Sequence, residues 1–361
     1  MVYTEREILK KEMNNETMKM FQNESKAQTM LVFWISTSVL RQKFLKLLLS
    51  SVIHQTTLSN FIRHQFKRPF KIDQFKQKDY MNASNFCPTF DEITDFSGPL
   101  SMGPLLINNL KEQEVAQRHS YIKSGGHWKP RNCLARHKIA IIIPFRDRQS
   151  HLTRLLDFLF PILKHQNLDF RFIITEQYGK ELFNKGKLMN AAFSFAEKLR
   201  VNCVIFHDVD MFPADDRINY GCPDTPRHIG AYVNTLGYRL MYAEIVGGVL
   251  AIRMNHFHAV NGFSNEFWGW GGEDDDMGIR ILTLNMTIER PDALIGRYVM
   301  LRHIKRKDSN NQLIKRMLKT SHIRMQWDGV KKLTWTILQV VERPLYYHLY
   351  VDVGRPPPGW H

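Results

Sequence analysis

The arrangement of apolar and polar positions becomes regular from about residue 136 onward. Continuous apolar runs are typical of strands that are buried on both faces of a sheet. Three such runs follow one another: KIAIIIPF at 138–145, DFRFIIT at 169–175 and NCVIFH at 202–207. Apolar residues at helical spacing over 151–163 and over 183–199 predict two intervening helices. Pro161 should kink the first of these helices or end it.

This order of strand, helix, strand, helix and strand is typical of an α/β fold with a mostly parallel sheet. Ligands bind such sheets beyond the carboxyl ends of the strands. Arg146–Arg148 follow the first predicted strand, and Asp208-Val209-Asp210 follows the third. If the backbone there is extended, both aspartates face the same side and can share a hard divalent ion. Such aspartate pairs are also common in surface loops, so their position after a buried strand is what favours a metal site.

The segment FWGWGGEDDD at 267–276 concentrates aromatic rings, glycines and acids. Its four consecutive carboxylates, Glu273–Asp276, repel one another unless a cation, a proton or the hydroxyl groups of a sugar lie among them. The tryptophans offer flat apolar faces on a glycine-rich backbone, which suits a sugar ring. An acidic helix start after a glycine-rich turn explains the segment equally well, because Asp and Glu favour helix N-termini. The segment alone leaves both interpretations open.

Residues 1–80 are rich in Lys, Gln and Asn and indicate a tail and stem outside the core. Their best apolar run, 30–40, ends at Arg41, short of the about 20 apolar residues that a bilayer span needs. The run extends through residue 53 only with three cations inside it. A membrane anchor over 30–53 and an amphipathic helix lying in the interface are therefore both open.

The formal net charge of +15 favours a polyanionic partner. The basic residues are spread along the chain, and no zinc-finger, helix-turn-helix or RNA-recognition signature accompanies them. A nucleic-acid partner is therefore not expected. A nucleotide-sugar or an acidic membrane surface fits the charge equally well.

The four cysteines form no CxxC motif, so a structural zinc site is not expected. They fit two disulfides in an oxidising lumen, or four buried thiols. The cysteines are Cys87, Cys133, Cys203 and Cys222. Triplets that permit N-glycosylation begin at Asn15, Asn23, Asn82 and Asn285, and they favour the same compartment.

A longer series of motifs occurs in one order along most of the chain. The motifs are IIIPFRDRQSHL at 141–152, FNKGKL at 183–188, FHDVDMFP at 206–213, PRHI at 226–229, VGGV at 246–249, NGFSNEFWGWGGEDDDMGIRI at 261–281, RYVMLRH at 297–303, DG at 328–329 and VDVG at 351–354. With them, the chain from about Cys87 to Val353 resembles the animal β-1,4-galactosyltransferase family, inverting glycosyltransferases of the Golgi. The resemblance implies a Rossmann-like, GT-A type nucleotide-sugar-binding domain over 81–361, with a mobile acceptor-site lid near 301–322.

The resemblance also implies a cofactor and a pairing of the cysteines. The cofactor would be Mn²⁺, held by Asp210, Met300 and His303. Chemistry alone would not select Met300, because a thioether is a soft ligand and a poor match for a hard ion. The implied disulfides are Cys87–Cys133 and Cys203–Cys222.

For the reaction, the resemblance implies that Asp274 is the general base, taking the proton of an acceptor 4-OH as it attacks the anomeric carbon. Glu273 and Asp275 would orient sugar hydroxyls, and Trp270 would contact both substrates from a mobile loop. One direct displacement inverts the anomeric configuration. The implied donor-binding residues are Pro144, Phe145, Arg146, Arg148, Phe183, Lys185, Asp208, Val209, Asp210, Ile245, Gly248 and Trp270. The implied acceptor-binding residues are Tyr242, Gly271, Gly272, Glu273, Asp274, Asp275, Met317 and Leu318.

Three places depart from the vertebrate pattern of that family. Ile245 stands where the vertebrate enzymes have a tyrosine that crowds out an N-acetyl group, so UDP-GalNAc is the expected donor and UDP-Gal the alternative. Lys185 replaces an arginine, which keeps the charge but not the bidentate fork. Met317 and Leu318 lie where the lid otherwise has an aromatic residue for the N-acetyl group of the acceptor. A terminal β-GlcNAc on a glycolipid or glycoprotein remains the expected acceptor.

A sugar-binding subunit without turnover is the interpretation from a different class. The sequence disfavours it, because the residues implied for metal binding and catalysis are present. The resemblance finally implies a type II Golgi membrane protein with a lumenal catalytic domain, anchored through its N-terminus.

Overall fold

The structure, a computed structural model, describes residues 85–107, 109–302, 310–332 and 334–360. All of them belong to one compact unit that spans 72–361. The tail and anchor predicted within 1–80 lie outside the described residues. Within the described part, no helix is both long enough and apolar enough to cross a membrane.

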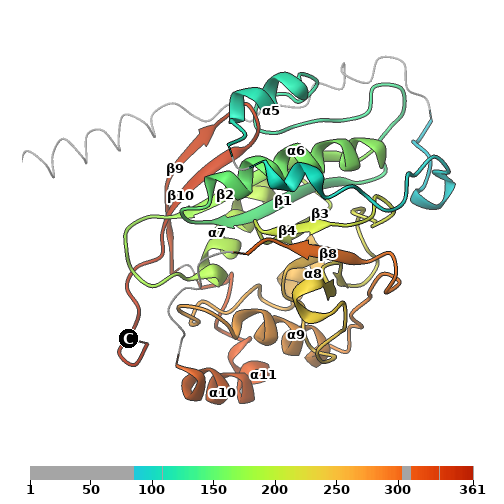
Figure 1. Ribbon diagram of the computed structural model, residues 1–361. Coiled ribbons are helices and arrows are strands. Elements are labelled where there is room, and N and C mark those ends of the chain that lie inside the picture. Colours follow the sequence, from blue (N-terminus) through green and yellow to red (C-terminus); the bar gives the residue numbers. More distant parts are fainter. Residues whose placement is uncertain (1–84, 108, 303–309, 333, 361) are drawn as a thin grey trace, which may run out of the picture. The chain divides into compact units, whose positions relative to one another are not determined.

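A seven-stranded, mostly parallel sheet forms the centre of the described unit (Figure 1). In spatial order its strands are β5 (Arg227–His228), β7 (Val249–Arg253), β3 (Cys203–His207), β1 (Lys138–Phe145), β2 (Asp169–Gln177), β10 (Tyr347–Asp352) and β9 (Thr336–Glu342). Strands β3, β1, β2 and β10 run parallel, whereas β7 and β9 run antiparallel to their neighbours. A smaller sheet contains β4 (Met211–Pro213), β8 (Arg297–Met300) and β6 (Tyr232–Val233). The predicted α/β fold with a mostly parallel sheet is confirmed.

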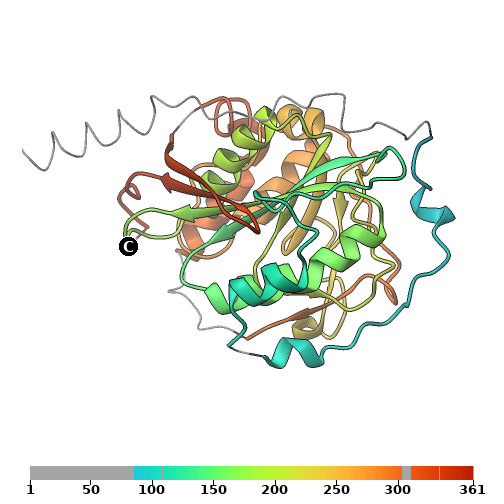
Figure 2. The same ribbon diagram turned by 90° about the horizontal axis from the view of Figure 1, so that it is seen from above.

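Helices cover both faces of the large sheet (Figures 1 and 2). One face carries α5 (Glu112–Arg118) and α6 (Gln149–His165), and the other carries α7 (Lys185–Lys198), α8 (Met254–Ala259) and α9 (Glu273–Thr283), with α10 (Asn311–Lys319) and α11 (Ser321–Arg324) beyond α9. Short 3₁₀ turns are η2 (Phe90–Glu92), η3 (Gly103–Leu106) and η4 (Asn234–Leu236). Because side chains alternate along a strand, Ile141 packs in the α6 core, and its neighbour Ile142 packs in the α7 core.

The predicted elements agree with the observed ones apart from their ends. The second helix begins at Lys185 rather than 183, because the Asn184 side chain accepts a hydrogen bond from the Lys187 amide and caps the helix. Helix α6 does not end at Pro161 but continues to His165. A proline cannot donate to the carbonyl four residues earlier, here that of Asp157. Because Pro161 is exposed, this carbonyl lies on the solvent side of the helix, where water can replace the missing donor.

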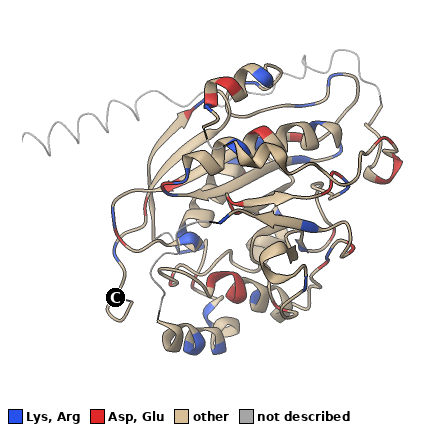
Figure 3. Cartoon of the chain, in the orientation of Figure 1, with Lys and Arg blue, Asp and Glu red and all other residues tan. Residues whose placement is uncertain are grey.

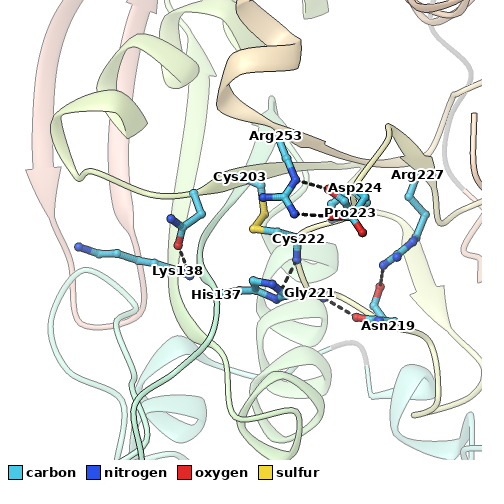
Figure 4. Close-up of a disulfide and its surroundings, with 11 residues drawn as sticks. His137, Lys138, Cys203, Asn219, Gly221, Cys222, Pro223, Asp224, Arg227 and Arg253 are labelled. Carbon is cyan, nitrogen blue, oxygen red and sulfur yellow. Dashed lines mark hydrogen bonds and ion pairs between the residues drawn. A yellow bond between two sulfur atoms is a disulfide. The ribbon is translucent and has the colours of Figure 1, made fainter. Parts of the chain in front are cut away.

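Both disulfides implied by the resemblance are present, Cys87–Cys133 and Cys203–Cys222. The second joins β3 to the segment that precedes β5 (Figure 4). Beside it, Arg253 donates to the Pro223 carbonyl and forms an ion pair with Asp224. The bridge between Cys203 and Cys222 therefore links the start of β3 to the chain shortly before β5.

A buried network of two aspartates and two arginines holds α9 in place. Arg280 pairs with Asp276 at 2.6 Å and with Asp328 at 3.2 Å. Arg324, from α11, pairs with the same two carboxylates at 2.5 and 2.7 Å. The Ser321 hydroxyl also donates to Asp276. Because the Arg280 and Asp276 side chains are 0% exposed, each charge depends on its partner in the network.

We expect Asp276→Asn to lower the free energy of unfolding by about 3–5 kcal/mol, because it leaves two buried guanidinium groups to share the single carboxylate of Asp328. The matched control is Asp224→Asn, since the Asp224 side chain is 100% exposed in its pair with Arg253. Its loss should change the free energy of unfolding by at most about 1 kcal/mol. Chemical denaturation of both variants measures the difference, and equal losses would contradict the role assigned to the network.

Candidate active site

A cavity of about 470 Å³ lies at the carboxyl ends of β1 and β3. Most of the residues named from the sequence line it. They are Pro144, Arg146, Arg148, Phe183, Lys185, Asp208, Val209, Asp210, Tyr242, Ile245, Gly248, Trp270, Gly271, Gly272, Glu273, Asp274, Asp275 and Met300. Residues from distant parts of the chain thus share one site, at the edge of the sheet where the strand order predicted it.

Four residues named from the sequence do not line the cavity or lie outside the described part. Phe145 is 5% exposed and belongs to the core on the α6 face, because it alternates with Pro144 along β1. Met317 and Leu318 lie on α10 and pack against the core on the α7 face. His303 lies outside the described residues. The described part of the segment predicted as a lid, 301–322, contains α10 and the start of α11, and its mobility stays a prediction.

Further residues line the cavity that the sequence did not single out. They are Met211, His228, Gly230, Ala231, Val233, Leu236, Met241, Gly247 and Gly269. Part of this wall comes from the PRHI and VGGV motifs, at 226–229 and 246–249. These motifs were the only sequence features that indicated this part of the cavity wall, but neither assigns a role to a single side chain.

The acidic segment is both a helix start and a wall of the cavity. Glu273, Asp274 and Asp275 form the first turn of α9, where the partial positive charge of the helix end stabilises carboxylates. In Figure 3 this turn is the red part of α9, with basic residues of α10 in blue beneath it. Gly271 and Gly272 have φ of 95° and 92°, which other residues rarely adopt. They leave Trp270, 67% exposed, at the cavity rim.

The Lys185 ammonium lies among three carboxylates. Its Nζ is 2.9 Å from Oδ2 of Asp274, 3.1 Å from Oδ1 of Asp208 and 3.4 Å from Oε1 of Glu273. Burial lowers the pKa of Lys185, but these carboxylates outweigh that effect and raise it well above its usual range. Lys185 is therefore a permanent cation that joins the end of β3 to the start of α9.

The same burial acts on the acids. Burial, followed by the charge of Asp274, raises the pKa of Glu273 to about 7. Burial also raises the pKa of Asp274 and of Asp208, although Lys185 opposes the shift in both. A carboxylate whose pKa is raised is a stronger base once ionised, so this cluster has the chemistry of proton transfer near neutral pH.

A further carboxylate, Asp210, lines the cavity two residues after Asp208. Its Oδ2 is 3.0 Å from a guanidinium nitrogen of Arg148, and its carbonyl accepts from the Leu301 amide at 2.9 Å. Met211 pairs with Met300 across β4 and β8. Asp210 lies in the turn just before β4, and Met300 is the last residue of β8, so both line the cavity. The carboxylate suits a hard divalent ion. Within the described residues, no three His, Cys, Asp or Glu side chains form a metal-binding group.

The loop around Ile245 packs directly on α9. A Cβ on Gly278 would lie 1.8 Å from the Glu244 carbonyl oxygen, so only glycine permits this contact. A Cβ on Gly247 would lie 3.0 Å from Oδ2 of Asp274. The Tyr242 hydroxyl donates to Asp275 at 2.5 Å. Ile245 is thereby held beside the acidic turn.

The chain matches two family models. One, described as the N-terminal region of glycosyl transferase group 7, matches residues 87–223. The other, described as the N-terminal domain of galactosyltransferase, matches residues 227–304. Together these matches include the cavity-lining residues from both sides of the site.

Named relatives give the same picture. The chain is 42% identical over 264 residues to β-1,4-galactosyltransferase 1 of Mus musculus, which covers 72% of this chain and 66% of the relative. It is 40% identical over 268 residues to β-1,4-galactosyltransferase 2 of Cricetulus griseus, covering 73% of this chain and 70% of the relative. The match therefore spans about two thirds of the length of these relatives.

Solved structures agree with the fold. Drosophila β-1,4-galactosyltransferase 7, crystallised as a mutant with manganese, UDP-Gal and xylobiose, matches with a TM-score of 0.54 and 28% identity. The match covers 60% of this chain and 94% of that chain. The same protein in complex with xylobiose matches equally well.

Glu273 should make the folded protein progressively less stable as the pH rises. Its pKa is about 7 in the folded protein against 4.5 ordinarily, so the folded state holds an extra proton between these values. Stability gained from that proton is complete below pH 4.5 and is lost as the pH rises through 7. We expect the Tm of the native protein to fall relative to Glu273→Gln across this window, by calorimetry without divalent ions. A constant difference would contradict the raised pKa.

Proposed function

The chain belongs to the β-1,4-galactosyltransferase family, and from this premise we propose that it is an inverting glycosyltransferase that moves GalNAc from UDP-GalNAc to the 4-OH of a terminal β-GlcNAc. The acceptor would be a glycan on a glycoprotein or glycolipid. One observation supports this most: Lys185, Asp208, Asp274 and Glu273 form a single charged cluster in a cavity that Ile245 also lines. UDP-Gal as donor is the alternative, since the named relatives are galactosyltransferases.

The basic residues and the Phe183 ring in the cavity suit the nucleotide. The Arg146 guanidinium lies 5.2 Å from the centre of the Phe183 ring, which offers a flat face and a charge for uridine and its diphosphate. Arg148 and Lys185 also line the cavity, Arg148 paired with Asp210 and Lys185 with the three carboxylates of the acidic cluster. Asp210, Met300 and His303 would hold Mn²⁺. When bound, the ion would offset the negative charge that develops on the departing UDP.

The acidic residues of the cavity suit the acceptor. Asp274 would take the proton from the acceptor 4-OH as that oxygen attacks the anomeric carbon, and one displacement inverts the configuration. Lys185 holds Asp274 at 2.9 Å, so the acceptor hydroxyl must compete with this ion pair. Trp270 at the rim provides an apolar face for a sugar ring. Glu273 and Asp275 would orient the acceptor hydroxyls.

Donor choice would depend on Ile245. Isoleucine has no hydroxyl for hydrogen bonding to a sugar, and it leaves room where a tyrosine ring would lie. The extra volume suits the acetamide group of GalNAc. Apolar pockets discriminate modestly, by about 10–200-fold for one small group, so some transfer from UDP-Gal is also expected.

Family membership supports a proposal for where this activity takes place. We place the catalytic domain in the Golgi lumen, attached to the membrane through the N-terminus. The two disulfides support an oxidising compartment. A sugar-binding subunit without turnover is disfavoured, because a carboxylate that could act as a general base, Asp274, and the cation of Lys185 lie in the same cavity.

Transfer from UDP-GalNAc and from UDP-Gal to a β-GlcNAc acceptor should be measured in parallel with Mn²⁺, and each again with EDTA. We expect faster transfer of GalNAc and loss of both activities with EDTA. In Ile245→Tyr the preference should move toward UDP-Gal by roughly 10-fold or more. An unchanged preference would refute the role of Ile245, whereas EDTA-resistant transfer would refute the metal requirement.

Asp274→Asn should lower kcat by about 10²–10⁴-fold, because the amide cannot accept the acceptor proton. Binding of UDP-sugar, measured by calorimetry, should persist, since the variant keeps the size of the side chain. Asp224→Asn, which removes an exposed carboxylate away from the cavity, is the control and should keep full activity. Full activity in Asp274→Asn would exclude it as the base.

A further inference from the structure

The end of α9 opposite the cavity has an exposed asparagine in a strained backbone conformation. Asn285 has φ of 56°, in the left-handed region. The amides of Leu284 and Met286 both donate to the Ile281 carbonyl, at 3.2 and 3.3 Å. This pattern is typical of a helix C-terminus, where asparagine and glycine are the usual residues. The backbone therefore explains an asparagine at 285, while the residue two positions later has a contact of its own, since its hydroxyl donates to the Thr225 hydroxyl at 3.3 Å.

That residue, Thr287, completes the triplet Asn285-Met286-Thr287, which accepts an N-linked glycan. The other three triplets of this kind begin at residues 15, 23 and 82, outside the described residues. Asn285 and Thr287 are both exposed. The loop is held by its backbone, because the Thr225 hydroxyl donates to the Thr287 carbonyl at 2.6 Å. The folded chain thus has room for a substituent on Asn285.

The surface beside Asn285 also favours a sugar. Leu282 and Leu284 are 40% and 39% exposed at the end of the same helix. Sugar rings have an apolar face, so the first residues of a glycan could cover these side chains. The acidic first turn of α9 lies at the other end of an 11-residue helix, about 16 Å away along its axis. A glycan at this end leaves the cavity open.

We propose that Asn285 carries an N-linked glycan. In the reaction the Asn285 side-chain nitrogen forms a bond to the anomeric carbon of an oligosaccharide carried on a polyprenyl diphosphate. The bond from that carbon to the diphosphate oxygen breaks, the polyprenyl diphosphate leaves with the electron pair, and the amide loses one proton. The modification requires entry into an oxidising secretory compartment, which the two disulfides favour. It does not depend on the proposed transferase activity.

The test uses the full chain behind a cleavable secretion signal in a eukaryotic cell. Formation of both disulfides verifies that the chain reached the lumen. The purified protein is treated with peptide N-glycosidase, and peptide mass spectrometry examines residue 285. After treatment, we expect most molecules to contain aspartate at residue 285. Before treatment, we expect few molecules to contain an Asn285 without a glycan. Unmodified Asn285 in a disulfide-bonded protein would overturn the proposal.

Variants separate the glycan from the fold. Asn285→Gly removes the acceptor while favouring the same left-handed backbone, and it should lose one glycan and remain folded. Thr287→Val should lose the same glycan, whereas Thr287→Ser retains the triplet and should keep it, at the same or lower occupancy. Before glycosidase treatment, Asn285→Gly and Thr287→Val should each migrate faster than the native protein by the mass of one glycan, and after treatment all three should migrate together. Equal migration of the native protein and both variants before treatment would contradict the proposal, whatever glycans the other three triplets carry.

Discussion

The buried pairing of Asp276 and Asp328 with Arg280 and Arg324 determines where α9 lies, and the site depends on α9. Each arginine contacts both aspartates, so no charge is left without a partner in a region that excludes water. Such an arrangement contributes less to net stability than to a unique geometry, since an apolar core could bury as much surface. Here the geometry is what matters, because the first turn of α9 presents three carboxylates to the cavity.

Lys185 performs a related task at the surface of the cavity. Glu273, Asp274 and Asp208 converge from two elements, and without a cation their mutual repulsion would favour the protonated forms. The lysine contacts all three. It comes from the first residue of α7, whose start is fixed by the Asn184 cap. A local feature of the backbone thus sets the position of the cation, and the cation sets the charge state of the acids around it.

The large elements could be predicted from the sequence because apolar runs and helical spacing report burial directly. The run 138–145 was a strand with the bounds expected, and the aspartates after the third strand line the cavity as the parallel order required. Features that depend on whether one position faces the solvent were harder to predict. Helix α6, for example, continues through Pro161, which the sequence alone would have expected to kink or end it. Phe145 was assigned to the site by resemblance, but the alternation of β1 directs it into the core. Residues such as His228 and Met211 could not be singled out, because nothing in their local sequence distinguishes a cavity wall from ordinary packing.

The contact between Gly278 and the Glu244 carbonyl has a consequence for redesign. A loop that rests on a helix through a missing side chain cannot come closer to that helix, and moving it away would open a gap at the contact. Attempts to enlarge the range of sugars accepted by lengthening or loosening this loop would displace the acids of α9 as well. Volume would have to be exchanged side chain for side chain, at Ile245 and its neighbours, on a backbone that stays where it is.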